Sequence, residues 1–134
     1  KYIERTGEMT KEILKIISDS MESLGLNYEF MEWTSEIRYP YFVGEYGETQ
    51  QSTEDGLQES SFILTGYTRG TWLSLEEIKE LIQAYFDAVN GHTEITASGS
   101  GVAIFYSNSF AVPTGDAALK KIQINLTIKE WKVK

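Results

Sequence analysis

The first regular hydrophobic pattern in the chain has the spacing of an amphipathic helix. Its apolar residues recur every three or four positions, at Ile13, Leu14, Ile17, Met21 and Leu24. Residues at this spacing lie along one face of a helix. Thr10 can cap the start, and Gly25 fits the left-handed position just past the end. The pattern predicts a helix from about Thr10 to Leu24.

A second helical pattern begins at Ser74, where the residues from Ser74 to Glu77 have the sequence of a capping box. In such a box the serine hydroxyl accepts from the Glu77 amide, and the Glu77 carboxylate accepts from the Ser74 amide. Apolar residues follow at helical steps as far as Val89, and Asn90-Gly91 supplies a helix stop. We therefore expect a helix from Ser74 to Val89 with Ser74 as its N-cap.

Four segments have the pattern of β-strands, and the last of them is the clearest. Ile122, Ile124, Leu126 and Ile128 alternate with polar residues, so one face of this strand is buried and the other is wet. The other expected strands span residues 37–46, 61–69 and 102–110. Pro40 has no amide hydrogen, so the first strand lies at a sheet edge or starts irregularly. Residues 27–34 predict a packed connector, with a short strand as the alternative.

These elements predict an α+β fold with the order helix, strand, strand, helix, strand, strand. Sequential strands joined by loops pair antiparallel, and two amphipathic helices can cover the apolar face of the sheet. We expect a four-stranded antiparallel sheet with both helices packed on one face. Residues 47–60 and 93–101 are expected to be loops, and the first is polar and long enough to reach a neighbouring copy.

Composition narrows the class of protein. A chain of 134 residues predicts a single α+β domain over residues 1–134, in which residues 1–8 are a tag remnant or a loose arm. The chain has no cysteine, which excludes disulfides and thiolate metal sites. No apolar run approaches the roughly 20 residues of a membrane span. A net charge of −8 argues against specific binding of nucleic acid, which needs concentrated positive charge.

The charge is distributed unevenly, because the middle of the chain is acidic and the last expected strand is basic. Contact between copies can use this pattern, with the basic strand of one copy against the acidic flank of the next. Ordinary solubility is the alternative explanation. The charged residues that make up the candidate assembly surface are Glu45, Glu48, Glu54, Asp55, Lys120, Lys121 and Lys129.

No arrangement of residues predicts catalysis, a cofactor or a metal site. His92 is the only histidine, and it follows a helix stop, where a histidine caps the helix or lies in solvent. The acidic residues of the polar loop match no calcium-loop spacing. Gly99-Ser100-Gly101 lacks the lysine of a phosphate loop and favours a hairpin instead. Aromatic side chains are expected mostly in core and cross-strand packing, with the lining of a pocket as the alternative.

Several segments together resemble the tail-terminator or tail-completion proteins of long-tailed bacteriophages. The resemblance covers about residues 9–133 and consists of element order and local sequence. The matching segments are the first helix, Tyr39 to Glu45, the polar loop, Phe62 to Tyr67, the capped helix and the strand Ile122 to Ile128.

The resemblance implies a non-enzymatic virion subunit, assembled in the bacterial host cytoplasm. It implies a ring, often of six copies, that ends the tail tube and joins it to the head. Its partners would be further copies, the tail tube protein and the head-completion protein, with neither specific nucleic acid binding nor a membrane. An alternative from another class is a small-ligand binding module with an aromatic pocket between sheet and helices. An enzyme is the third possibility.

Overall fold

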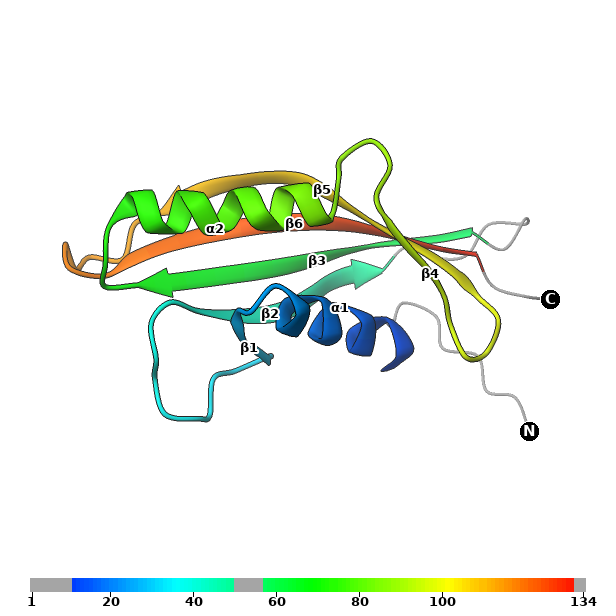
Figure 1. Ribbon diagram of the computed structural model, residues 1–134, viewed down its shortest axis with the longest axis horizontal. Helices are drawn as coiled ribbons and strands as arrows, with labels where there is room; N and C mark the ends of the chain where they lie inside the picture. The colour runs from blue at the N-terminus through cyan, green and yellow to red at the C-terminus, as the bar shows by residue number, and fades with distance from the viewer. Residues whose placement is uncertain (1–10, 50–56, 132–134) are drawn as a thin grey trace.

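The computed structural model describes residues 11–49 and 57–131 and contains two helices against one mixed sheet (Figure 1). The helices are α1 (Lys11–Ser23) and α2 (Trp72–Tyr85). The strands are β1 (Asn27–Phe30), β2 (Tyr41–Thr49), β3 (Leu57–Thr68), β4 (His92–Ile95), β5 (Gly101–Val112) and β6 (Lys120–Trp131). Figure 1 shows the long strands β3, β5 and β6 running the length of the molecule, with both helices on the near side.

The six strands lie in the order β1-β2-β3-β6-β5-β4. Strands β1 and β2 run parallel, and every other neighbouring pair is antiparallel. The chain is α+β with two helices, as predicted, but the prediction of a four-stranded antiparallel sheet is wrong. The sheet is curled. It has six strands because a short strand is added at each edge, and it is mixed because one of these, β1, runs parallel to its neighbour. Neither β1 nor β4 is long enough to give a readable period, and each forms through its pairing with the next strand.

The long polar loop expected over residues 47–60 is also shorter than predicted. Residues 47–49 belong to β2 and residues 57–60 belong to β3, in register with β6 from Leu57 opposite Trp131. Ladder hydrogen bonds use the backbone, so polar side chains do not prevent a strand where a partner strand is present. Even Gln58 and its partner Glu130 are buried.

The core lies between the helices and one face of the sheet. The alternation predicted for β6 is confirmed, because its four apolar residues from Ile122 to Ile128 are all buried. The rings of Phe42 and Phe62 lie on the same buried face. The Phe42 ring lies over Gly66 of β3, and the Phe62 ring lies over Gly44 of β2. A Cβ added to Gly66 would lie 2.7 Å from Cζ of Phe42, so the ring occupies the space that a side chain would take. These contacts fix β2 against β3.

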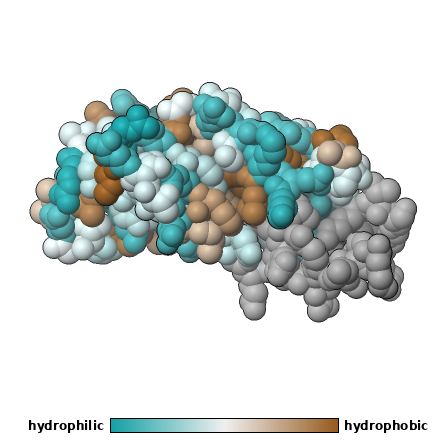
Figure 2. Space-filling view, turned by 90° about the horizontal axis from the view of Figure 1, so that it is seen from below, coloured by the Kyte–Doolittle hydropathy of each residue, from teal (hydrophilic) through white to brown (hydrophobic). Residues whose placement is uncertain are grey.

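The opposite face of the sheet carries no described helix, and we call it the open face. Its side chains alternate with the buried ones along β2, β3 and β6. The residues of the open face used below are Tyr41, Glu45, Glu59, Tyr67, Phe105, Asn108, Lys121, Gln123, Asn125, Thr127 and Lys129. Figure 2 views the molecule from below, at 90° to Figure 1, and therefore does not look directly onto the open face; outside its grey region, hydrophobic patches on the side shown are small and interspersed with hydrophilic side chains.

Helix α1 ends as the sequence predicts. Gly25 has a φ of +75°, the left-handed conformation that glycine adopts without strain. The Leu26 amide donates to the Met21 carbonyl at 3.0 Å, and the Gly25 amide donates to the Glu22 carbonyl at 2.9 Å. This pair of hydrogen bonds is a Schellman motif, which reverses the chain into β1.

Helix α2 starts and ends earlier than predicted. Thr71 is the N-cap, and its hydroxyl accepts from the Ser74 amide at 3.1 Å. The Ser74 hydroxyl donates to the Thr71 carbonyl at 2.7 Å, so Ser74 lies in the first turn and does not cap. At the other end Phe86 is buried, and its carbonyl accepts from the Tyr106 amide at 2.7 Å next to a bulge in β5. This tie to β5 ends the helix before Val89.

We expect Thr71→Ala to lower the free energy of unfolding by roughly 1 kcal/mol, the usual contribution of a threonine N-cap. Ser74→Ala is the matched control, and it should cost clearly less because it leaves the cap intact. Urea denaturation of both variants measures the difference. If Ser74→Ala costs as much as Thr71→Ala, Ser74 has a capping role that this geometry lacks.

Candidate assembly surface

The three lysines predicted for the assembly surface do not lie on one face. Lys121 and Lys129 lie on the open face, while Lys120 lies on the helix-covered side near the turn between β5 and β6. The Lys120 ammonium donates to the Ala117 carbonyl at 3.3 Å. Lys120 therefore holds its own turn, and only the other two can meet a partner from the open face.

The two lysines of the open face differ in their surroundings. Nζ of Lys129 lies 3.6 Å from a carboxylate oxygen of Glu59 and 5.6 Å from the centre of the Phe105 ring. Nζ of Lys121 lies 5.5 Å from the centre of the Tyr67 ring and has no ion-pair partner among the described residues. The charge of Lys129 is therefore largely compensated within the chain, whereas that of Lys121 is available.

The acidic half of the predicted surface is described only in part. Glu45 is exposed on the open face, opposite Ile63 of β3, and no described residue pairs with its carboxylate. Glu48 belongs to β2, but its side chain lies outside what the structure describes, as do Glu54 and Asp55. Glu45 is thus the one predicted acidic residue whose side chain can be placed.

The two available charges are separated on the open face. Lys121 is in register with Tyr67, which is in register with Tyr41, four residues before Glu45 on β2. At about 3.3 Å per residue, the row of Lys121 and the row of Glu45 are about 13 Å apart along the strands. The open face therefore has a basic end at Lys121 and an unpaired acid, Glu45, on β2 in the row of Ile63 and Asn125.

Four aromatic rings form a continuous row at the basic end. The ring centres of Trp33 and Tyr41 are 4.8 Å apart, those of Tyr39 and Tyr41 are 5.6 Å apart, and those of Tyr41 and Tyr67 are 4.9 Å apart. The guanidinium carbon of Arg69 lies 5.9 Å from the centre of the Tyr39 ring. The Tyr41 and Tyr67 rings stack across β2 and β3, which confirms the predicted cross-strand packing for this pair. No pattern in the sequence indicates that Trp33 joins this row.

The middle of β5 and β6 is neutral and polar on the open face. Asn125 donates its side-chain amide to Asn108 at 2.6 Å and accepts from the Gln123 amide at 3.0 Å. Ser107 and Thr127 share a hydrogen bond of 2.6 Å. These side chains bond to one another and carry no charge. Directional binding through the open face therefore depends on the unpaired charges of Lys121 and Glu45.

The helix-covered side leaves the predicted aromatic pocket little room. Phe42, Phe62 and Phe86 are fully buried between sheet and helices, whereas Tyr39, Tyr41 and Tyr67 lie in the row on the open face. His92 begins β4, and its Nε2 lies 2.7 Å from Glu94. Its ring stacks on Tyr85 with the centres 4.6 Å apart. The histidine is engaged by its neighbours and does not lie loose in solvent.

Within residues 11–49 and 57–131, no three histidine, aspartate or glutamate side chains come close enough to hold a metal ion together. Two of the acidic residues considered for a cation, Glu54 and Asp55, lie outside those ranges. None of the described helices has the length and apolar character needed to cross a membrane.

The predicted hairpin at Gly99-Ser100-Gly101 is confirmed as the connection between β4 and β5. Helix α1 holds this turn. The Ser98 hydroxyl donates to Oε1 of Glu12 at 2.7 Å, and the Ser98 amide donates to Oε2 at 3.1 Å. These hydrogen bonds hold the pKa of Glu12 below its ordinary value of 4.5. The start of α1 is thereby tied to the far edge of the sheet.

Comparisons with known proteins leave the chain without assigned relatives: no protein-family model matches it, and neither does any curated protein. The functional argument therefore depends on the open face and on the resemblance in the sequence.

We expect Glu12→Gln to lower the melting temperature at neutral pH and to do so less as the solution is acidified. A carboxylate with a lowered pKa in the folded state contributes stability above its unfolded pKa, and this contribution is lost as the pH falls through the folded pKa. The difference from the unmodified chain should therefore shrink below pH 4.5. Thermal melts across this range measure it.

Glu77→Gln is the matched control for this experiment. Glu77 is exposed on α2 and has no described partner. Its substitution should change the melting temperature little, with no trend across the acidic range. A constant difference for Glu12→Gln at all pH values would contradict the role given to the Ser98 hydrogen bonds.

Proposed function

We propose that this chain is a non-enzymatic structural subunit of a phage or prophage tail. In this proposal, copies form a ring at the end of the tail tube, and the ring terminates the tube and joins it to the head. One observation carries the proposal: the open face has an unpaired base, Lys121, near the start of β6 and an unpaired acid, Glu45, about 13 Å further along the strands on β2.

A surface with two separated, opposite charges favours contact between unlike patches of neighbouring copies. Such head-to-tail contact repeats from copy to copy, and it closes into a ring when the rotation between neighbours divides a full turn. Glu45 of one copy would meet Lys121 of the next. Each exposed pair contributes only about 0.2–1 kcal/mol, so the contact becomes stable only when it is repeated around a closed ring.

The polar middle of β5 and β6 supports a chain that is soluble before assembly. Asn125 bonds to both Asn108 and Gln123, so these positions of the open face carry polar side chains and not an apolar patch. Assembly would then depend on concentration and on the tube end as a template. The proposed partners are further copies, the tail tube protein and the head-completion protein, and the proposed location is the virion.

Two measurements test the proposal together. Light scattering and negative-stain electron microscopy of the concentrated chain should show closed rings. Deletion of its gene from the phage or prophage that encodes it should give tubes that run past their normal length and carry no heads. Tails of normal length joined to heads in the deletion strain would reject the proposal.

We expect Lys121→Glu to weaken self-association, because it places an acid where Glu45 of the next copy would approach. The matched control is Lys120→Glu, which makes the same charge change one residue away on the other side of the sheet. It should leave association nearly unchanged. Sedimentation velocity over a concentration series measures both, and added salt should weaken the association of the unmodified chain.

The double variant Lys121→Glu with Glu45→Lys exchanges the two charges and should recover part of the lost association. Equal effects of Lys120→Glu and Lys121→Glu would show that net charge alone is responsible. Association that strengthens with salt would indicate an apolar contact and contradict the role of Lys121 and Glu45.

A further inference from the structure

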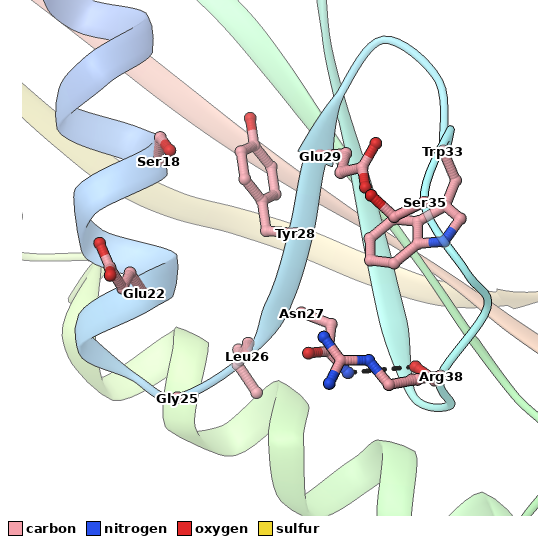
Figure 3. A pocket seen from close by; sticks show the side chains of 10 residues that line it. All are labelled: Ser18, Glu22, Gly25, Leu26, Asn27, Tyr28, Glu29, Trp33, Ser35 and Arg38. Carbon is pink, nitrogen blue, oxygen red and sulfur yellow. Dashed lines mark hydrogen bonds between the residues drawn. The ribbon is translucent and has the colours of Figure 1, made fainter.

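A groove runs along the outer edge of β1 (Figure 3). Its volume is about 440 Å³, which is within the usual range of ligand sites. One wall is α1, which contributes Ser18 and Glu22, and the other is the segment from Met31 to Tyr39, which contributes Trp33, Ser35 and Arg38. Figure 3 shows β1 between these two walls. A strand edge therefore lines an open channel.

The backbone of β1 has hydrogen-bonding groups that point into this channel. The Met31 amide donates to the Gly44 carbonyl of β2 at 2.7 Å. Backbone groups of a strand point alternately to its two sides, so Asn27, Glu29 and Met31 bond toward β2. The amide and carbonyl of Tyr28 and the amide of Phe30 point the other way. No further described residue bonds to these groups, so β1 retains an unused strand edge.

The two walls offer unpaired charges of opposite sign. Glu22 lines the groove from α1, and Arg38 lines it from the opposite segment. No described residue forms an ion pair with either side chain. The other polar residues hold the wall itself: Glu29 accepts from the Thr34 amide at 2.9 Å, and Asn27 donates to the Pro40 carbonyl at 3.0 Å. These hydrogen bonds hold the wall of the groove in place, and the charges of Glu22 and Arg38 remain available to a ligand.

We propose that this groove binds an extended peptide segment of a partner protein as an additional strand on β1. Its backbone would bond to Tyr28 and Phe30, as in other cases of strand addition to a sheet edge. Successive side chains of a strand point to opposite sides, so neighbouring residues of the peptide face different walls. The segment therefore has adjacent side chains of opposite charge, the basic one toward Glu22 and the acidic one toward Arg38.

A second copy of this chain fits the groove less well than a single strand does. The other edge strand of the described sheet is β4, which is half of a hairpin whose turn is bonded to Glu12. A hairpin would bring β5 along with β4, whereas a separate peptide brings one strand alone. The proposal does not depend on the ring, because the groove lies at the sheet edge and the ring contact uses the open face.

The experiment is a titration of the ¹⁵N-labelled chain with the acetylated and amidated peptide Val-Thr-Lys-Glu-Thr-Val, followed by NMR. The amides of Tyr28 and Phe30 should shift and saturate. Peptides with Lys-Lys or Glu-Glu at the centre should bind up to about fivefold more weakly, the range of one exposed charge pair. A peptide N-methylated at both central residues should bind up to about tenfold more weakly, because one of these two adjacent amides points toward β1 and loses its hydrogen bond.

Arg38→Glu gives a matched test of the wall. This variant should prefer the Lys-Lys peptide over the Glu-Glu peptide, while amides remote from the groove keep their positions. Equal binding of the N-methylated peptide, or no saturable shift of Tyr28 and Phe30 with any of the peptides, would overturn the proposal. If the same amides shift as the concentration of the chain alone is raised, a second copy fills the groove. The proposed occupant, a peptide segment of a partner protein, would then be wrong.

Discussion

The antiparallel pairing of β3 with β6 is the contact on which the rest of the structure depends. It runs from Leu57 opposite Trp131 to Thr68 opposite Lys120 without a register shift. The register places Phe62 opposite Leu126 on the buried face and Tyr67 opposite Lys121 on the open face. A slip of one residue would turn every side chain of one strand to the other face. The core and the polarity of the open face are therefore both set by this one register.

The same pairing joins two halves of similar construction. Each half is a helix followed by three strands, and in each half the last strand lies at the centre of the sheet and the first at an edge. The halves differ at those edges. Strand β1 runs parallel to β2 and leaves a groove beside α1, whereas β4 forms a hairpin with β5 whose turn bonds to Glu12. The hairpin edge is thus tied back to the molecule, while the edge at β1 stays accessible.

The sequence was sufficient for features that depend on local pattern and insufficient for those that depend on distant partners. The alternation of β6 and the glycine end of α1 were predictable, because each follows from neighbouring residues. The capping box at Ser74 was misleading, because Thr71 lies one turn earlier and caps through the same kind of hydroxyl contact. Strands β1 and β4 and the register of β3 with β6 needed pairing across the sheet. For the candidate surface, the charged residues could be named from the sequence. That Lys120 and Lys121 lie on opposite faces of the sheet became clear only when each face was assigned as covered or open.

The proposed ring contact and the proposed peptide groove share one side chain. Trp33 lines the groove and also packs against Tyr41, which stacks on Tyr67 beneath Lys121. This row is a contiguous path from the edge of β1 to the basic end of the open face. A contiguous row of side chains does not by itself couple the two surfaces. Coupling needs an element that has two arrangements, and binding at each surface must change the balance between them. Rings packed at about 5 Å and anchored on paired strands have little freedom to provide one. The segment from Met31 to Tyr39 crosses between the two surfaces outside any strand, so coupling between peptide and ring would have to arise there.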